Sequence, residues 1–242
     1  MTILILSDIH SNYRALKAVL DEFGDADEIW CLGDIVEYGP SPSECIQLLR
    51  EACTCVVMGN HDRTLANFDP VTGNPDSWAA YDYPNVSEEE REYLASLPSS
   101  LTKEVDEKSL LLLHGSPQGP VSSGLRPATD LEILEEAASM TQEEVILCAH
   151  THMAMKLEVG GTTILNTGTI GQPRDGDYRA QCWLLQDGEF HFRRVDYDLN
   201  ELEADYRRSN IPENIQDEWI RYTRRGIVDV HGLQVGPFTG HG

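Results

Sequence analysis

The sequence TILILSDIH at residues 2–10 sets the architecture of this chain. Residues 2–6 form a largely apolar run of strand length, and Asp8 and His10 follow it directly. Open α/β sheets place their functional groups just beyond the carboxyl ends of the strands, so a buried strand that ends in metal-ligating side chains is typical of such a site. This stretch therefore predicts a central strand with a functional site at its end.

Four other apolar runs end in the same way. They span residues 28–32, 54–58, 109–113 and 144–149, and they are followed by Gly33-Asp34, Gly59-Asn60-His61-Asp62, His114-Gly115 and His150-Thr151-His152. Five of the eight histidines stand at these run ends. Because the ends of neighbouring strands meet at one edge of a sheet, we expect residues that are far apart in the chain to share one crevice.

The composition narrows the class of protein. The net charge of -23 comes from 41 acidic against 18 basic residues, so the chain repels anionic membranes, and stable nucleic-acid binding is not expected. No run approaches the roughly 20 apolar residues of a membrane span, which favours a cytoplasmic protein. The acidic surface is either an adaptation to a salt-rich cytosol or that of an ordinary acidic protein. Refolding in molar KCl after low-salt unfolding would support the first interpretation.

The six cysteines show no CxxC pair and do not occur at the run ends. We interpret them as small buried apolar residues rather than as disulfide partners or zinc ligands.

Strands and helices alternate in the first third of the chain. Helices are expected at residues 13–23 and 43–52, between the first three strands, which indicates parallel βαβ units. Residues 67–85 are rich in Pro, Gly, Asn and Asp and predict a long loop or lid. Ser87 and Glu90 have the spacing of a capping box, so a helix should begin there and stop before Pro98.

The second half predicts hairpins and then helices. We expect a hairpin of strands 101–105 and 109–113, a helix at 129–140, and a second, mostly antiparallel sheet from residues 155–159, 162–165, 181–185 and 189–195. A helical extension covers about residues 198–242, with a helix start at Pro212, a stop at Gly226 and a Gly-rich tail from His231. The predicted domain is single, residues 1–242, with a core at about 1–197.

The residue types at the run ends suit two divalent cations. Asp8 and His10 are two residues apart and can share one ion. His150 and His152 have the same spacing and could serve either one ion or two neighbouring ions. Asp34 stands alone at its strand end and is the natural bridge, because a carboxylate offers one oxygen to each metal.

Counting charges predicts an electropositive site within the acidic chain. Two divalent ions carry more charge than Asp8 and Asp34 remove, whereas Asn60 adds a neutral oxygen. Such a site attracts phosphate, and a bridging water loses a proton readily, which makes a bridging hydroxide the expected nucleophile. His61, beside Asn60, is the candidate general acid for the leaving alkoxide.

The blocks DxH, GD, GNHD, H and HTH, in this order, resemble the calcineurin-like metallophosphoesterase superfamily. Residues 7–12, 59–63, 114–117 and 166–174 are specifically similar to its small prokaryotic phosphodiesterase branch. The resemblance implies an α/β fold, a four-layer αββα sandwich with two mixed β-sheets. It also implies one metal held by Asp8, His10, Asp34 and His152 and another held by Asp34, Asn60, His114 and His150, with His61 as the proton donor. Manganese is the favoured metal, and iron, nickel, cobalt or zinc are alternatives.

Three positions depart from the family pattern. Ala149 stands where the family usually has Gly before HTH. Glu37 stands where this branch commonly has Gly, and we hypothesise that its carboxylate orients His61; the alternative is a solvent-exposed carboxylate. Tyr38 replaces a phosphate-binding arginine of the protein phosphatases, which argues against a phosphoprotein substrate.

Two further residues are candidates for contact with substrate phosphate. Asn12 lies beside the first ligand pair, and Arg174 follows a Gly-rich loop. Arg174 could instead pair with Asp175 or Asp177.

The sequence therefore predicts a metal-dependent phosphodiesterase that acts on small phosphate esters, with nucleotides among the candidates. A phosphomonoesterase or phosphoprotein phosphatase is the alternative, and a non-catalytic scaffold on the same fold is a weaker one, because the full ligand set is present.

Overall fold

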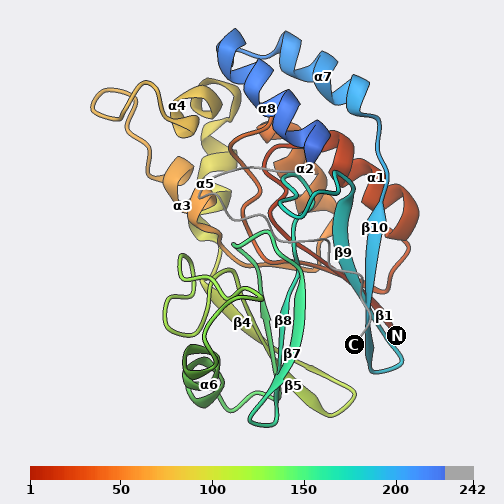
Figure 1. The fold of residues 1–242 in the computed structure, drawn as a ribbon. Helices are drawn as coiled ribbons and strands as arrows, with labels where there is room; N and C mark the ends of the chain where they lie inside the picture. The colour runs from red at the N-terminus through yellow and green to blue at the C-terminus, as the bar shows by residue number, and fades with distance from the viewer. Residues whose placement is uncertain (227–242) are drawn as a thin grey trace.

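The computed structural model describes residues 1–226 and contains two five-stranded sheets (Figure 1). The strands of the first sheet are β1 (Thr2–Leu6), β2 (Glu28–Cys31), β3 (Cys55–Val56), β9 (Ala180–Gln186) and β10 (Glu189–Val195). Those of the second sheet are β4 (Ser100–Val105), β5 (Lys108–Leu113), β6 (Val145–Cys148), β7 (Met155–Val159) and β8 (Thr162–Asn166). Their spatial orders are β10-β9-β1-β2-β3 and β4-β5-β6-β8-β7.

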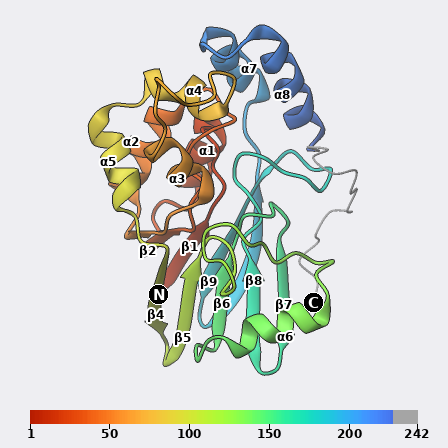
Figure 2. The ribbon, with the colours of Figure 1, turned by 90° about the vertical axis from the view of Figure 1, so that its left-hand side faces the viewer.

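Helices cover the outer faces of the two sheets. They are α1 (Tyr13–Phe23), α2 (Pro42–Ala52), α3 (Asn60–Ala66), α4 (Trp78–Asp82), the 3-10 helix η1 (Tyr83–Asn85), α5 (Glu88–Ser96), α6 (Leu131–Ser139), α7 (Leu199–Arg208) and α8 (Glu213–Arg225). Helix α6 packs on the second sheet, whereas α1, α2 and α5 lie on the side of the first (Figure 2). The expected αββα sandwich with two mixed sheets is confirmed.

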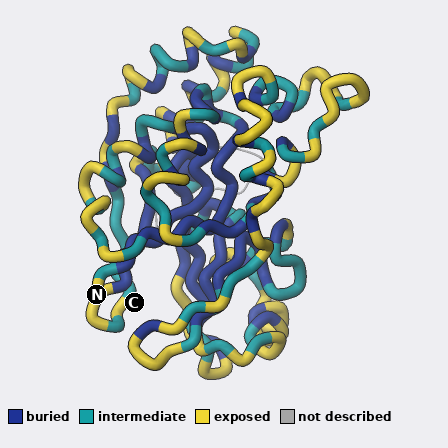
Figure 3. The backbone as a smooth tube through the Cα atoms, turned by 180° about the vertical axis from the view of Figure 1, so that it is seen from behind, coloured by how far each residue is buried: buried dark blue, intermediate teal, exposed yellow. Residues whose placement is uncertain are grey.

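Strand β1 shows how the sequence produces these layers. Ile3 and Ile5 pack in the apolar layer between the sheets, whereas Leu4 and Leu6 pack beneath the helices, as the two-residue repeat of a strand requires. All four side chains have no exposed surface. A strand that is buried on both faces must be apolar at every position, which explains the continuous run. Figure 3 shows that the buried backbone lies in the interior of the molecule.

Parallel pairing places the strand ends that matter at one edge. Strand β1 is parallel to β2, and β2 to β3, while β5, β6 and β8 are parallel in the second sheet. The carboxyl ends of these strands therefore point the same way within each sheet. The segments that carry the predicted ligands follow these ends.

The hairpins form as expected, but they do not build a separate antiparallel sheet. The pairs β4-β5, β7-β8 and β9-β10 are antiparallel. However, β9 joins the first sheet beside β1, and β8 joins the second beside β6. The reason is burial, because residues 180–185 of β9 are all buried and cover an edge of β1 that would otherwise be unpaired.

Residues 67–85 are not a continuous loop, which corrects the sequence prediction. They contain α4 and η1, and the side chain of Ser77 caps α4 by accepting a hydrogen bond from the Ala80 amide at 3.2 Å. Trp78 and Tyr81 then pack against the helix-side core. Tertiary packing and a cap stabilise this short helix, which has too few turns to show a periodic pattern.

The described part of the extension shares the core with the rest of the chain. Tyr206, Ile211 and Ile220 belong to the helix-side core, and Gly226 ends α8 in a left-handed conformation with φ 60°, as predicted. The tail that includes His231 and His241 lies outside the described residues. The single domain over residues 1–242 stays a prediction.

The cysteines are all free, and Cys31, Cys45, Cys148 and Cys182 are buried, as expected for small apolar residues. No helix within residues 1–226 has the length and apolar character needed to cross a membrane.

Candidate metal centre and active site

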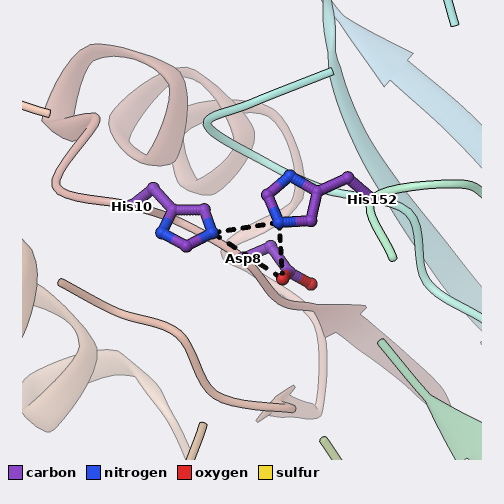
Figure 4. Close-up of side chains that lie close together, drawn as sticks. All are labelled: Asp8, His10 and His152. Carbon is purple, nitrogen blue, oxygen red and sulfur yellow. Dashed lines mark hydrogen bonds and ion pairs between the residues drawn. The ribbon is translucent and has the colours of Figure 1, made fainter. Parts of the chain in front are cut away.

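Six of the seven predicted ligands converge from four separate strand ends. Their ligand atoms form two groups, and within each group the atoms lie within 4.8 Å of one another. The groups are Asp8, His10 and His152, and Asp34, His114 and His150. Figure 4 shows the first group, in which the two imidazoles and the carboxylate point toward a common centre.

Hydrogen bonds fix the tautomers in the first group. The Nδ1 atoms of His10 and His152 face the carbonyl oxygens of Val36 and Gln172, at 3.1 and 2.9 Å. Because a carbonyl only accepts, each Nδ1 carries the hydrogen and each Nε2 presents a lone pair. The two Nε2 atoms lie 3.1 Å apart, and that of His152 is 3.2 Å from Oδ1 of Asp8. Electron-rich atoms at these distances repel one another, and a cation between them would offset that repulsion.

The second group meets the first at Asp34. Oδ2 of Asp34 lies 3.1 Å from Nε2 of His114 and 3.8 Å from Nε2 of His10, so this one oxygen faces both groups. Nδ1 of His114 is held by the Leu32 carbonyl at 2.7 Å, and Nδ1 of His150 lies 3.3 Å from Nε2 of His114. The position of Asp34 is the one that a bridging carboxylate needs.

Two orphaned oxygen atoms support the fit to metal ions. Oδ1 of Asp8 and Oδ1 of Asn60 are buried without a hydrogen-bond partner among the described residues. A buried polar atom without a partner is costly, and a cation would satisfy it. Together with the imidazoles, these oxygens form a donor set suited to manganese, iron, cobalt, nickel or zinc.

Electrostatics favour the deprotonated forms that metals bind. Burial opposes ionisation of Asp8 and Asp34, but the neighbouring imidazoles outweigh it and hold the pKa of each carboxyl below its usual range. Burial lowers the pKa of His10, and burial together with His114 lowers that of His150 to about 4. His114 is the exception, since Asp34 overcomes burial and raises its pKa to about 9. A cation at that position would replace the proton.

Five of the ligands adopt a backbone conformation that side chains disfavour. Their φ angles are positive: Asp8 49°, His10 47°, Asp34 54°, His150 68° and His152 60°. The left-handed region costs about 1–2 kcal/mol for a residue with a side chain. Strain of this kind occurs at sites that the surrounding structure holds in place.

Asp62 holds the loop that carries Asp34, a role that the sequence pattern did not predict. Its carboxylate accepts hydrogen bonds from the backbone amides of Asp34, Ile35 and Gly59 at 2.8 to 2.9 Å. Gly59 is also required, because a Cβ there would lie 2.1 Å from Oδ1 of Asp34. The signal available in the sequence was the fourth position of GNHD.

Glu37 lies against His61 rather than in solvent. Oε2 of Glu37 is 2.5 Å from Nδ1 of His61, and Glu37 is only 4% exposed. Nε2 of His61 points toward Asp34, 4.0 Å from Oδ2. Burial disfavours a charged His61, but Asp34 and Glu37 outweigh burial and raise its pKa to about 9. This geometry leaves Nε2 free for a proton transfer.

Asp82 holds the backbone of Glu37, and the sequence pattern did not predict this role either. Its buried carboxylate, on α4, accepts a hydrogen bond from the Glu37 amide at 2.8 Å. Glu37 itself has a φ of 68°, so this bond holds a strained residue in place. Burial raises the pKa of Asp82 well above its ordinary value.

The two candidate phosphate contacts differ. The amide of Asn12 is occupied, since its Oδ1 caps α1 at Ala15 and its Nδ2 donates to the Gly171 carbonyl and the Tyr197 hydroxyl. A helix cap is therefore its evident role.

Arg174 has a free donor near the ligands. Its Nη2 donates to Gln172 at 2.7 Å, while its buried Nε has no partner among the described residues. Asp175 and Asp177 instead bind Arg194 and Arg179. Burial lowers the pKa of Arg174, and the charges of Asp8, Tyr38 and Asp34 oppose that change. Gln172 links the two sites, because its side chain accepts from Arg174 and its carbonyl faces Nδ1 of His152.

Comparison with known proteins identifies relatives over most of the chain. The sequence model of the calcineurin-like phosphoesterase superfamily domain matches residues 1–187. A crystal structure of a metallophosphoesterase from Sphaerobacter thermophilus superimposes with a TM-score of 0.80 at 30% identity, covering 94% of this chain and 99% of that one. An uncharacterized protein of Methanocaldococcus jannaschii is 28% identical over 237 residues, 87% of this chain and 94% of its own length.

Two relatives carry the names of hydrolases. Phosphodiesterase YfcE of Escherichia coli is 23% identical over 200 residues, which cover 77% of this chain and 89% of that protein. A symmetrical bis(5'-nucleosyl)-tetraphosphatase of Erwinia tasmaniensis is 36% identical over 67 residues, a match that spans 26% of this chain and 24% of that enzyme.

Proposed function

This chain belongs to the calcineurin-like phosphoesterase superfamily, and we propose that it is a phosphodiesterase that hydrolyses small phosphate esters with two divalent metal ions. The observation that carries the proposal is the shared position of Asp34, whose Oδ2 faces both His10 and His114. One carboxylate between two groups of imidazole and carboxylate donors is the arrangement that a dinuclear centre would use.

The proposed ligand sets follow from the two groups. Asp8, His10 and His152, together with Asp34, would hold one ion, and Asp34, His114 and His150, together with the unpaired oxygen of Asn60, would hold the other. Manganese is the proposed native metal, since histidine, carboxylate and amide oxygen all suit it. When bound, two such ions would draw charge from the phosphate and lower the pKa of a shared water so that it attacks the phosphorus.

The chain's own residues would position the ester and move the proton. His61 donates a proton from Nε2 to the leaving oxygen, and Glu37 holds the ring through Nδ1 so that Nε2 faces the site. Arg174 supplies its free Nε–H to a phosphate oxygen. Asp82 acts through Glu37, by fixing the backbone that presents that carboxylate.

The charge balance favours an anionic substrate despite the acidic chain. Two divalent ions exceed the negative charge of Asp8 and Asp34, and Arg174 adds a further positive charge. The site is therefore a local positive region in a protein with a net charge of -23. A small phosphate ester in the cytoplasm is the proposed substrate, with nucleotides among the candidates.

The test is a hydrolysis assay on metal-reconstituted protein. Full-length protein is stripped with a chelator, reloaded with Mn²⁺, and assayed on bis-p-nitrophenyl phosphate and p-nitrophenyl phosphate. We expect faster turnover of the diester, and we expect Asn60→Ala to lose most of it. His191→Ala, a histidine on β10, is the matched control. Failure of the wild-type protein to hydrolyse any ester would favour the non-catalytic scaffold.

A further inference from the structure

Three aromatic side chains form a wall beside the candidate active site. We call Tyr38, Trp78 and Trp219 the aromatic wall. The rings of Tyr38 and Trp219 stack with centroids 4.7 Å apart and planes 26° from parallel. Trp78 lies 5.3 Å from both rings, with interplanar angles of 69° and 87°. The stacked pair and Trp78 therefore make a corner of two nearly perpendicular aromatic surfaces.

The wall is continuous with the catalytic groups. The ring of Tyr38 lies 4.8 Å from the rings of both His10 and His61. Trp78 comes from α4, and Trp219 comes from α8, beyond the region matched by the family model. Helix α8 crosses the top of the molecule beside α4 in Figure 1, and the contact between the two indoles joins them. The C-terminal extension thus contributes a side chain to the site.

The indole N–H groups of the wall are unpaired within the described residues. All three residues are only partly buried. The indole nitrogens of Trp78 and Trp219 have no hydrogen-bond partner within residues 1–226, and neither is a buried orphan atom. The Tyr38 hydroxyl is more enclosed, because burial raises its pKa to about 12. The buried indole of Trp30 differs, because it donates to Glu28 at 2.7 Å. Rings that only fasten α8 to α4 have no need of unpaired donors.

We propose that the aromatic wall binds the nucleobase of a nucleotide ester whose phosphate lies at the proposed metal centre. This inference rests on the proposed phosphodiesterase function and names its substrate class. Two ring contacts, with centroids 4.8 and 4.7 Å apart, lead from His61 through Tyr38 to Trp219, so a nucleotide whose phosphate meets His61 would extend its base toward the wall. A base would stack on one surface of the corner and meet indole N–H donors at the other.

The wall gives affinity for a flat ring without reading one base. Stacking on tryptophan tolerates any base, because every base has a π-face. Arg174 would bind the phosphate, and the wall the base, so that the two ends of the nucleotide are held separately. The expected signature is discrimination between nucleoside and simple alkyl esters rather than a preference for one base.

The experiment compares two diesters that share one leaving group. Full-length, Mn²⁺-loaded protein is assayed with the p-nitrophenyl ester of thymidine 5'-phosphate and with methyl p-nitrophenyl phosphate. We expect wild-type kcat/KM to favour the nucleoside ester, and Trp219→Leu to reduce that ratio about tenfold, which is within the range of base stacking. Trp219→Phe should keep most of the ratio. Tyr178→Leu removes a ring that pairs with Tyr197 outside the wall, and it should leave the ratio unchanged.

The outcomes separate the wall from the proposed function. If both esters turn over with equal kcat/KM, and neither Trp219→Leu nor Trp78→Leu alters this, the proposed nucleobase site is wrong. The proposed phosphodiesterase function would not be affected by that result. Turnover of neither ester would overturn the proposed function. In that case calorimetric binding of AMP and ribose 5-phosphate decides the wall, which requires AMP to bind about tenfold more tightly and Trp219→Leu to remove the difference. Circular dichroism checks that each variant is folded, and Trp219→Phe serves if Trp219→Leu is not.

Discussion

The two candidate ligand groups differ in how firmly the protein holds them. In the first group Asp8, His10 and His152 are at most 2% exposed, and both imidazoles are fixed through Nδ1 by backbone carbonyls. In the second group His150 is only partly buried, and its Nδ1 faces His114 instead of a carbonyl. The comparison indicates a closed, preorganised site beside a more open one. Through Tyr38, the aromatic wall adjoins His10 of the closed group.

Replacing Asp34 should reduce activity the most, because its carboxylate faces both groups. Asp34→Asn removes the charge that faces both His10 and His114. We expect kcat for bis-p-nitrophenyl phosphate to fall about 10⁴-fold or more, together with a loss of bound metal measured by mass spectrometry. Asp76→Asn, at an exposed carboxylate, is the control. Two ions per chain with near wild-type kcat would remove Asp34 from its bridging role.

Removing His61 should separate catalysis from metal binding. His61→Ala is expected to reduce kcat about 10³-fold for a diester with a poor leaving group, and less for p-nitrophenyl esters, whose leaving oxygen needs no proton. Its Nε2 stands 4.0 Å from Asp34, and it belongs to neither ligand group, so metal content should not change. Equal turnover of the poor-leaving-group diester by variant and wild type would refute the general-acid role.

Chelation should show the difference between the two groups directly. We expect one ion to leave the Mn²⁺-loaded protein about tenfold faster than the other, because the ring of His150 lacks the carbonyl that fixes His10 and His152. His150→Ala should retain about one ion per chain. Stopped-flow measurements with a metallochromic chelator provide the rates. A single release phase for both ions would mean that the groups are equivalent.

Altering the partner of His61 should have the smallest effect. A general acid works only while protonated, so activity is lost as pH rises through its pKa. Asp34 and Glu37 overcome burial to raise the pKa of His61 to about 9, and a bound cation would draw on the charge of Asp34, which leaves Glu37 as the main support. Glu37→Gln should therefore move the alkaline limb of the rate profile downward and reduce kcat about tenfold.

The test of this pairing is a pH–rate profile with Asp82→Ala in parallel. The variant at Asp82 should shift the limb in the same direction but less, because it disturbs Glu37 only through its backbone. An unchanged profile for Glu37→Gln would end the assignment.

Much of the fold and the site follows from the sequence, and the reason is local. Each ligand directly follows an apolar run, and in a parallel sheet that position alone places it at the common edge. The sheet that each hairpin joins could not be predicted in this way. The pairing of β9 with β1 joins residues about 180 positions apart, and no local pattern specifies it.

The groups that support the site were harder to predict than the ligands. The carboxylates of Asp62 and Asp82 accept hydrogen bonds from backbone amides. Any buried carboxylate can fill this role, and no periodic pattern in a sequence marks it. The aromatic wall could not be predicted from the sequence either, because Tyr38, Trp78 and Trp219 come from three separate segments. Only the folded chain brings them together.

Because its ligand residues have a left-handed backbone, the stability of this protein should depend on the metal available to it. Each strained residue would be relaxed by glycine, yet glycine carries no ligand, so selection cannot improve stability and metal binding together at the same position. The metal-free chain bears that strain alone, whereas ions that bind only the native state offset it by mass action. The melting temperature should then rise with the free concentration of the metal, and the lifetime of the protein in a cell would depend on that concentration.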